Sequence, residues 1–124
     1  MRTIDAIAEI LKREGVEYLS CFPTTPVIEA AAAAGIRPIV CRQERVGVGI
    51  ADGFSRVTNG ERMGVFAMQY GPGAENAYSG VATSYSDSVP VLFLPLGHPT
   101  DKQGILPHFD SMRNYQGVNK YIEQ

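Results

Sequence analysis

Glu44 is the residue whose type and position point most directly to chemistry. It follows a short apolar run and opens a segment with the apolar spacing of a helix, so we expect it in the first turn of a helix. Two interpretations stay open: an acid favoured by the helix dipole, or a carboxyl group that acts on a ligand. Gly47, Gly49 and Gly53 follow in the same helix. Each costs up to about 1 kcal/mol relative to alanine, so we expect them to serve close packing against another backbone, a partner or a flat ligand.

A second candidate is the turn Gly71-Pro72-Gly73, which lies between an apolar run and another predicted helix. Such a turn can direct backbone amides toward an anion, or it can simply let the helix start close to a sheet. The lysine and hydroxyl residue of a phosphate loop do not follow it, and the three-glycine dinucleotide motif is absent. Asn76, one turn into that helix, is either a ligand contact or a solvated polar group.

The elements that must position these residues alternate along the chain. We expect a first helix capped by Thr3 and ended by Gly15, then helices over 26–34, 43–57, 74–85 and 110–115, and strands over 18–22, 38–41, 63–68 and 89–95. This alternation predicts an α/β three-layer sandwich, with a mainly parallel sheet and helices on both faces. Ligands bind such sheets at the carboxyl ends of the strands, where Glu44, the glycine turn and the loop Pro23-Thr24-Thr25 are expected.

Composition favours one small domain and excludes several classes of function. The 124 residues carry 11 basic and 13 acidic side chains with no concentrated basic region, so we expect no nucleic-acid partner. No apolar run approaches the ~20 residues of a membrane span, and the N-terminus lacks a signal-peptide core, so we expect a cytoplasmic protein. Cys21 and Cys41 lie in strand-like runs and are expected to be buried without chemistry. They form no metal-ligand spacing with His98 or His108. Four strands leave a bare sheet edge, so residues 1–124 are expected to be a single, incomplete domain.

Several segments together resemble the N-terminal pyrimidine-binding domain of thiamine diphosphate-dependent enzymes, in the acetolactate synthase and 2-oxo acid decarboxylase group. Between about Gly15 and Gly97 they follow the order and separations of that family. The segments are Arg42-Gln43-Glu44, Ala51-Asp52-Gly53-Phe54-Ser55-Arg56 with Gly60, Gly71-Pro72-Gly73-Ala74-Glu75-Asn76 with Gly80, and Ser86-Asp87-Ser88-Val89-Pro90-Val91-Leu92.

The resemblance implies roles for three residues. Glu44 would hydrogen-bond a ring nitrogen of the cofactor's aminopyrimidine and favour the imino form, whose exocyclic nitrogen removes the thiazolium proton. Pro72 and Asn76 match positions beside the pyrimidine or the substrate. The implied reaction is decarboxylation or carboligation of 2-oxo acids, with the cofactor as electron sink.

The resemblance also implies partners. The family holds the diphosphate through Mg²⁺, with a Gly-Asp-Gly motif and a downstream asparagine in a separate domain, and this sequence has neither. Ala51-Asp52-Gly53 is expected inside a helix and is not that motif. We therefore expect half a site, inactive alone, completed by the diphosphate-binding domain of the same or another chain, and a homo-oligomer. Asp110 stands where a glutamine is more usual in the synthase branch.

Three alternatives stay open. The chain could be the small subunit of a two-chain decarboxylase of sulfo- or phosphono-oxo acids. It could be a non-catalytic assembly module with the same fold. It could also be an unrelated flavodoxin-like domain that binds a nucleotide.

Overall fold

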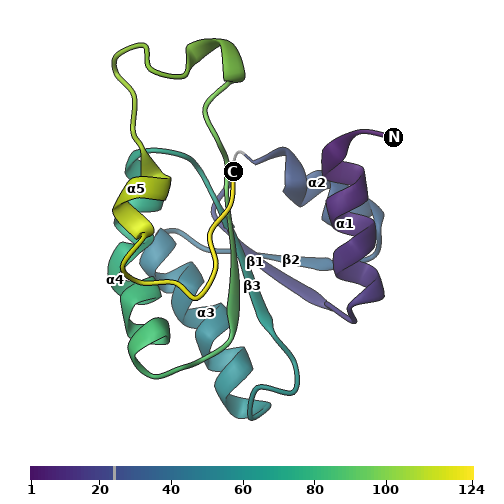
Figure 1. Ribbon diagram of the computed structural model, residues 1–124. Helices are drawn as coiled ribbons and strands as arrows, with labels where there is room; N and C mark the ends of the chain where they lie inside the picture. The colour runs from purple at the N-terminus through teal and green to yellow at the C-terminus, as the bar shows by residue number, and fades with distance from the viewer. Residues whose placement is uncertain (24) are drawn as a thin grey trace.

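Strands and helices alternate around a four-stranded, all-parallel sheet with the order β2-β1-β3-β4 (Figure 1). The computed structural model describes residues 1–23 and 25–124, and Thr24 of the predicted loop lies outside them. The elements are α1 (Thr3–Arg13), β1 (Tyr18–Cys21), α2 (Pro26–Ala33), β2 (Arg37–Val40), α3 (Glu44–Val57), β3 (Gly64–Met68), α4 (Pro72–Ser86), β4 (Val91–Pro95), the 3-10 turn η1 (Thr100–Lys102) and α5 (Ser111–Tyr115).

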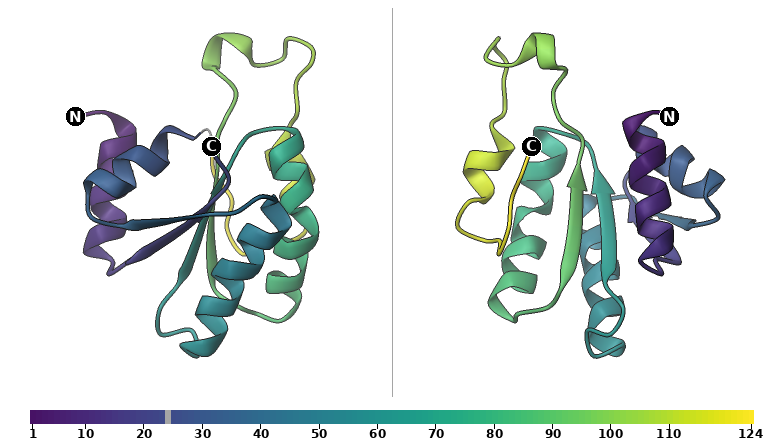
Figure 2. Two further views of the ribbon diagram at one scale, coloured as in Figure 1. Left: turned by 180° about the vertical axis from the view of Figure 1, so that it is seen from behind. Right: turned by 45° about the vertical axis from the view of Figure 1, so that its right-hand side comes forward.

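The helices form one layer on each face of the sheet. Figure 2 shows α1 and α2 on one side, α3 and α4 on the other, and α5 outside α4. Each face has its own apolar core, built around Leu19 and Ile36 on the α1–α2 side and around Phe66 and Val48 on the α3–α4 side. The predicted three-layer α/β fold is confirmed. Both cysteines are free and buried, as predicted, with Cys21 in the first core and Cys41 in the second.

Most predicted boundaries agree with the structure to within one residue, and three of the differences have clear local reasons. Arg2, not Thr3, is the N-cap of α1, because the Asp5 carboxylate accepts a hydrogen bond from the Arg2 backbone N–H at 3.2 Å. The helix α4 begins at Pro72, two residues early, since proline suits a first helical position. The strand β4 begins at Val91, two residues late, because Pro90 has no N–H to donate to the ladder.

Glycines let α3 lie close to its neighbours. A Cβ on Gly47 would lie 2.2 Å from Cε2 of Phe66, and a Cβ on Gly80 of α4 would lie 2.7 Å from Cγ1 of Val48. Gly49 and Gly53 differ: nothing in the described chain lies within 4 Å of a Cβ built on either. Of the three helix glycines, packing inside the chain therefore explains only Gly47.

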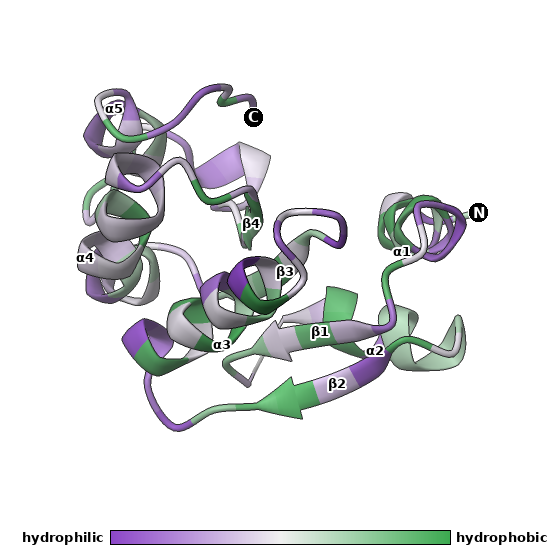
Figure 3. Cartoon of the chain, turned by 90° about the horizontal axis from the view of Figure 1, so that it is seen from below, coloured by the Kyte–Doolittle hydropathy of each residue, from purple (hydrophilic) through white to green (hydrophobic). Residues whose placement is uncertain are grey.

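The outward side of α3 borders an apolar groove. Seen from below in Figure 3, α3 runs beside β1 and β3, and β2 forms the outer edge of the sheet. Ile50 and Phe54 of α3 line the groove together with Tyr18 and Ile39 of the sheet. Across residues 1–23 and 25–124, no helix has the length and apolar character needed to cross a membrane.

Candidate functional site

The predicted site residues lie where α3 and α4 begin, after the carboxyl ends of β2 and β3. Glu44 is the first residue of α3, and Asn76 lies in the second turn of α4. The two helices run side by side, and Gly80 of α4 leaves room for Val48 of α3. Their packing brings Glu44 and Asn76 together although they are 32 residues apart in sequence.

The Glu44 carboxylate is buried and held from the neighbouring helix. Glu44 is 7% exposed, and Nδ2 of Asn76 donates a hydrogen bond to its Oε2. An acid that only favours a helix dipole can stay in solvent, as Glu29 does in the first turn of α2. Burial of a carboxylate is costly without hydrogen-bond partners, and Asn76 supplies one. Glu44 is therefore a buried carboxylate whose Oε2 is held by the neighbouring helix.

The second oxygen of Glu44 faces the space left by Gly73. A Cβ on Gly73 would lie 3.3 Å from Oε1 of Glu44 and 3.0 Å from Cβ of Gln69. In the part of the chain that the structure describes, Asn76 is the sole donor of a hydrogen bond to this carboxylate. Oε1 thus remains available to a donor or acceptor outside the described chain. The Gly71-Pro72-Gly73 turn was predicted to direct backbone amides toward an anion or to let the helix start close to the sheet. The position of Gly73 beside Glu44 was not predicted.

The other predicted positions have different surroundings. Pro72 is the exposed first residue of α4, one residue before Gly73, and no hydrogen bond ties it to Glu44. Gly71 has a positive φ of 58°, and a Cβ there would lie 3.0 Å from the ring of Phe109. The Gly73 amide donates to the Tyr70 carbonyl at 3.4 Å, inside the turn itself. This supports the tight-turn interpretation of Gly71-Pro72-Gly73.

Cys41 lies at the end of β2, close to Glu44. Burial raises the pKa of the Cys41 thiol, backbone hydrogen bonds oppose this, and the negative charge of Glu44 raises the pKa further. The thiol therefore stays protonated at neutral pH. Cys41 contributes apolar volume beside the carboxylate and no second charge.

The segment after β4 covers the glycine turn with aromatic side chains. The rings of Tyr70 and His98 lie 4.3 Å apart, and those of His98 and His108 lie 5.0 Å apart.

The Asp110 carboxylate accepts a hydrogen bond from the Arg113 backbone N–H at 3.0 Å, so it caps α5. Asp110, which stands where a glutamine is more usual in the synthase branch, therefore has a structural role as the N-cap of α5.

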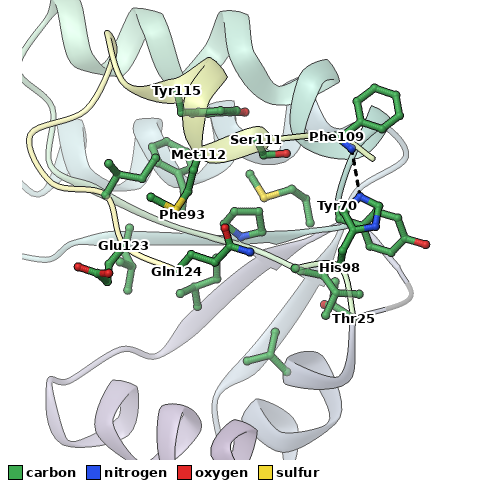
Figure 4. A pocket seen from close by; sticks show the side chains of 18 of the residues that line it. Thr25, Tyr70, Phe93, His98, Phe109, Ser111, Met112, Tyr115, Glu123 and Gln124 are labelled. Atoms are coloured by element: carbon green, nitrogen blue, oxygen red, sulfur yellow. Dashed lines mark hydrogen bonds between the residues drawn. The ribbon is translucent and has the colours of Figure 1, made fainter. Parts of the chain in front are cut away.

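A separate cavity of about 490 Å³ lies along β4 (Figure 4). Its walls include Phe93, His98 and Met112, and neither Glu44 nor Asn76 is among the residues that line it. The hydroxyl oxygens of Thr25 and Ser111, which also line it, are buried without a hydrogen-bond partner in the described residues. No local sequence pattern predicts this cavity, because its walls come from segments that are far apart in the chain.

The sequence of this chain also matches a known protein family. Residues 1–120 match the family model of the thiamine pyrophosphate enzyme, N-terminal TPP binding domain. The acetolactate synthase large subunit of Haemophilus influenzae is 36% identical over 94 residues, which cover 73% of this chain and 16% of that protein. The probable acetolactate synthase large subunit of Methanocaldococcus jannaschii is 37% identical over 126 aligned positions, covering 98% of this chain and 21% of that protein. The chloroplastic acetolactate synthase of Arabidopsis thaliana is 35% identical over 92 residues, covering 71% of this chain and 13% of that protein.

The chain thus spans between about an eighth and a fifth of the length of these relatives. The match extends over both halves of the sheet and includes Glu44, Gly73 and Asn76. A flavodoxin-like nucleotide-binding domain unrelated to these enzymes, one of the alternatives above, is therefore wrong. The chain belongs to the thiamine pyrophosphate (thiamine diphosphate) enzymes, as their N-terminal, pyrimidine-binding domain.

Proposed function

We propose that this chain supplies the pyrimidine side of a thiamine diphosphate site that acts on 2-oxo acids, with Glu44 as the catalytic residue. The observation that supports this most is the buried Glu44 carboxylate, with Oε2 bound by Asn76 and Oε1 facing the gap at Gly73. A non-catalytic assembly module would have no need for a buried carboxylate fixed in this way.

The residues at the site fit an aminopyrimidine ring. A ring nitrogen that shares a proton needs a carboxyl group in a dry position, and Glu44 is one. Thiamine diphosphate, when bound, supplies an electron sink for the carbonyl carbon of a 2-oxo acid. Glu44 holds the shared proton at Oε1, Asn76 fixes Oε2, and the protonated Cys41 keeps the surroundings apolar. Asn76 thus acts on the cofactor through Glu44, and Pro72 is proposed to contact the ring from the exposed side of the turn.

The diphosphate and Mg²⁺ belong to a second domain in this proposal. The 124 residues contain no Gly-Asp-Gly motif, and Ala51-Asp52-Gly53 lies in the interior of α3, where Asp52 pairs with Arg56 at 2.5 Å. Asp52 is therefore not a metal ligand here. The names of the relatives favour carboligation of two 2-oxo acids to an acetolactate-type product, with decarboxylation by a two-chain enzyme as the alternative.

A reconstitution experiment tests the division into two half-sites. We expect the 124-residue chain with thiamine diphosphate and Mg²⁺ to turn over no 2-oxo acid, and a diphosphate-binding domain of the same family added to it to restore turnover. Pyruvate consumption and product identity by NMR provide the measurement: a 2-hydroxy-3-oxo acid indicates carboligation, and an aldehyde indicates decarboxylation. Turnover by the isolated chain would contradict the proposal that it supplies only half a site.

We further propose self-association through the outward face of α3. Gly49 and Gly53 present bare backbone, and Val46 and Val57 on the same helix are 53% and 84% exposed. The adjacent groove lined by Ile50 is apolar as well. Bare glycine backbone permits close helix approach, and clustered exposed apolar side chains favour association.

Sedimentation velocity at high micromolar concentration tests this surface. We expect dimers or larger species for the wild type and a shift toward monomer for Gly49→Glu, because the added charge would be buried at the contact. Gly117→Glu is the matched control, since Gly117 lies after α5, far from α3 in sequence, with open space around its Cβ position. A wild-type chain that sediments as a single monomer would rule out association through this face.

A further inference from the structure

The first turns of α4 are tied to two other helices through three consecutive residues. The Ala74 carbonyl accepts a hydrogen bond from the hydroxyl of Tyr115, and Oε1 of Glu75 accepts one from Nδ2 of Asn114 at 2.8 Å. The next residue, Asn76, donates to Glu44. Two of these three ties thus come from the short helix α5.

The start of α4 packs into the core through Ala74 and Ala77, but no side chain caps it. Its N-cap is Gly71, which has no side chain to close the first turn, and Gly73 follows two residues later. Glycine backbone is the most costly to order, and a helix N-terminus without a side-chain cap frays. Hydrogen bonds from outside the helix therefore help to fix the position of Asn76.

Tyr115 is suited to supply that contact. It is the buried residue of α5, 7% exposed, and its ring meets Tyr78 of α4 edge to face at 5.4 Å. Burial raises the pKa of the Tyr115 hydroxyl, and the negative charge of Glu75 raises it further, so the group stays a hydrogen-bond donor. Its own helix is held by the Asp110 cap.

We infer that Tyr115 is a positioning residue, which holds the start of α4 where the Asn76 amide reaches the Glu44 carboxylate. The catalytic meaning of this inference rests on the proposed function of Glu44. The hydrogen bonds of Tyr115 to Ala74 and of Asn76 to Glu44 do not depend on that function. Removal of the Tyr115 hydroxyl leaves the Ala74 carbonyl without that donor and loosens the turn. The Asn76–Glu44 hydrogen bond then opens more often.

Side-chain amide exchange measures this opening directly. In ¹⁵N NMR spectra of the chain, the Asn76 side-chain amide is identified by its loss in Asn76→Ala. We expect its hydrogen exchange to be slow in the wild type and about 10-fold or more faster in Tyr115→Phe, because local opening governs exchange. Tyr85→Phe is the matched control, since Tyr85 lies exposed near the other end of α4, and it should leave the rate unchanged.

Two outcomes of the exchange experiment would overturn the inference. One is an Asn76 amide that exchanges at the wild-type rate in folded Tyr115→Phe. The other outcome applies if Tyr115→Phe fails to fold. Asn114→Ala then serves as the second variant, because it removes the hydrogen bond from α5 to Glu75. An unchanged exchange rate of the Asn76 amide in Asn114→Ala would contradict positioning by α5.

A double-mutant cycle separates positioning from general stability. In the assembled enzyme we expect Tyr115→Phe to weaken thiamine diphosphate binding about 3- to 10-fold, and to have no further effect in an Asn76→Ala background, since the two residues act in series. Equal losses in both backgrounds would overturn the inference. If Glu44→Gln leaves the enzyme fully active while the Asn76 amide still responds to Tyr115→Phe, the proposed function fails and the positioning role stands.

Discussion

Glu44→Gln is expected to lower turnover of the assembled enzyme by about 100-fold or more, the scale typical of lost acid–base catalysis. Glutamine keeps the size of the side chain and an oxygen for Asn76 to donate to, but it cannot share a proton with a ring nitrogen. The steady-state rate with saturating cofactor measures the loss. Exchange of the cofactor's thiazolium proton in deuterated water gives a second readout that does not depend on knowing the substrate.

Folding should change little in this variant, because the amide satisfies the same buried position. Glu29→Gln is the matched control: Glu29 is also an acid in a first helical turn, but it is exposed. It should leave turnover intact, and thermal midpoints should agree among the three proteins. Full activity of Glu44→Gln at saturating cofactor would end the catalytic assignment. A large drop in its thermal midpoint with activity kept would assign Glu44 to stability instead.

Gly47→Ala and Gly49→Ala are expected to change stability in opposite directions, although the two glycines lie two residues apart in α3. A Cβ on Gly47 would overlap Phe66 and would lie 2.7 Å from Sγ of Cys41, and Phe66 is fully buried between sheet and helix. Overpacking of this kind costs about 1–3 kcal/mol or more. A Cβ on Gly49 meets nothing in the described chain, so alanine should stabilise the helix by up to about 1 kcal/mol.

Urea unfolding of both variants and the wild type measures the difference. The expected order of unfolding midpoints is Gly49→Ala above wild type above Gly47→Ala, compared at a concentration where all three have the same oligomeric state. Because Gly47 lies three residues after Glu44, we also expect weaker thiamine diphosphate binding in assembled Gly47→Ala. A Gly47→Ala protein as stable as the wild type would mean that α3 can move away from β3 without cost, and that Gly47 does not set their distance.

The sequence determined the order and type of the elements because their signals are local. Gly15 follows α1 with a positive φ, as its position predicted, since a left-handed residue ends a helix at low cost only when it is glycine. Pro26 opens α2 at the predicted position. Buried parallel strands are continuously apolar, so their pattern also indicated a sheet covered on both faces. The position of Glu44 at the start of α3 follows from the same signals.

Only the tertiary structure decided what these residues contact. Asn76 could have been a solvated side chain, and its bond to Glu44 exists because α3 and α4 pack side by side. Gly47, Gly49 and Gly53 look alike in sequence, yet the rotation of α3 turns Gly47 toward Phe66 and leaves the others open. Contacts between residues far apart in the chain depend on helix rotation and distance, which the packing of the whole domain sets and no local pattern encodes. The contact of Tyr115 is equally non-local, because Tyr115 follows β4 in sequence and its hydroxyl reaches the Ala74 carbonyl of α4 only in the folded domain.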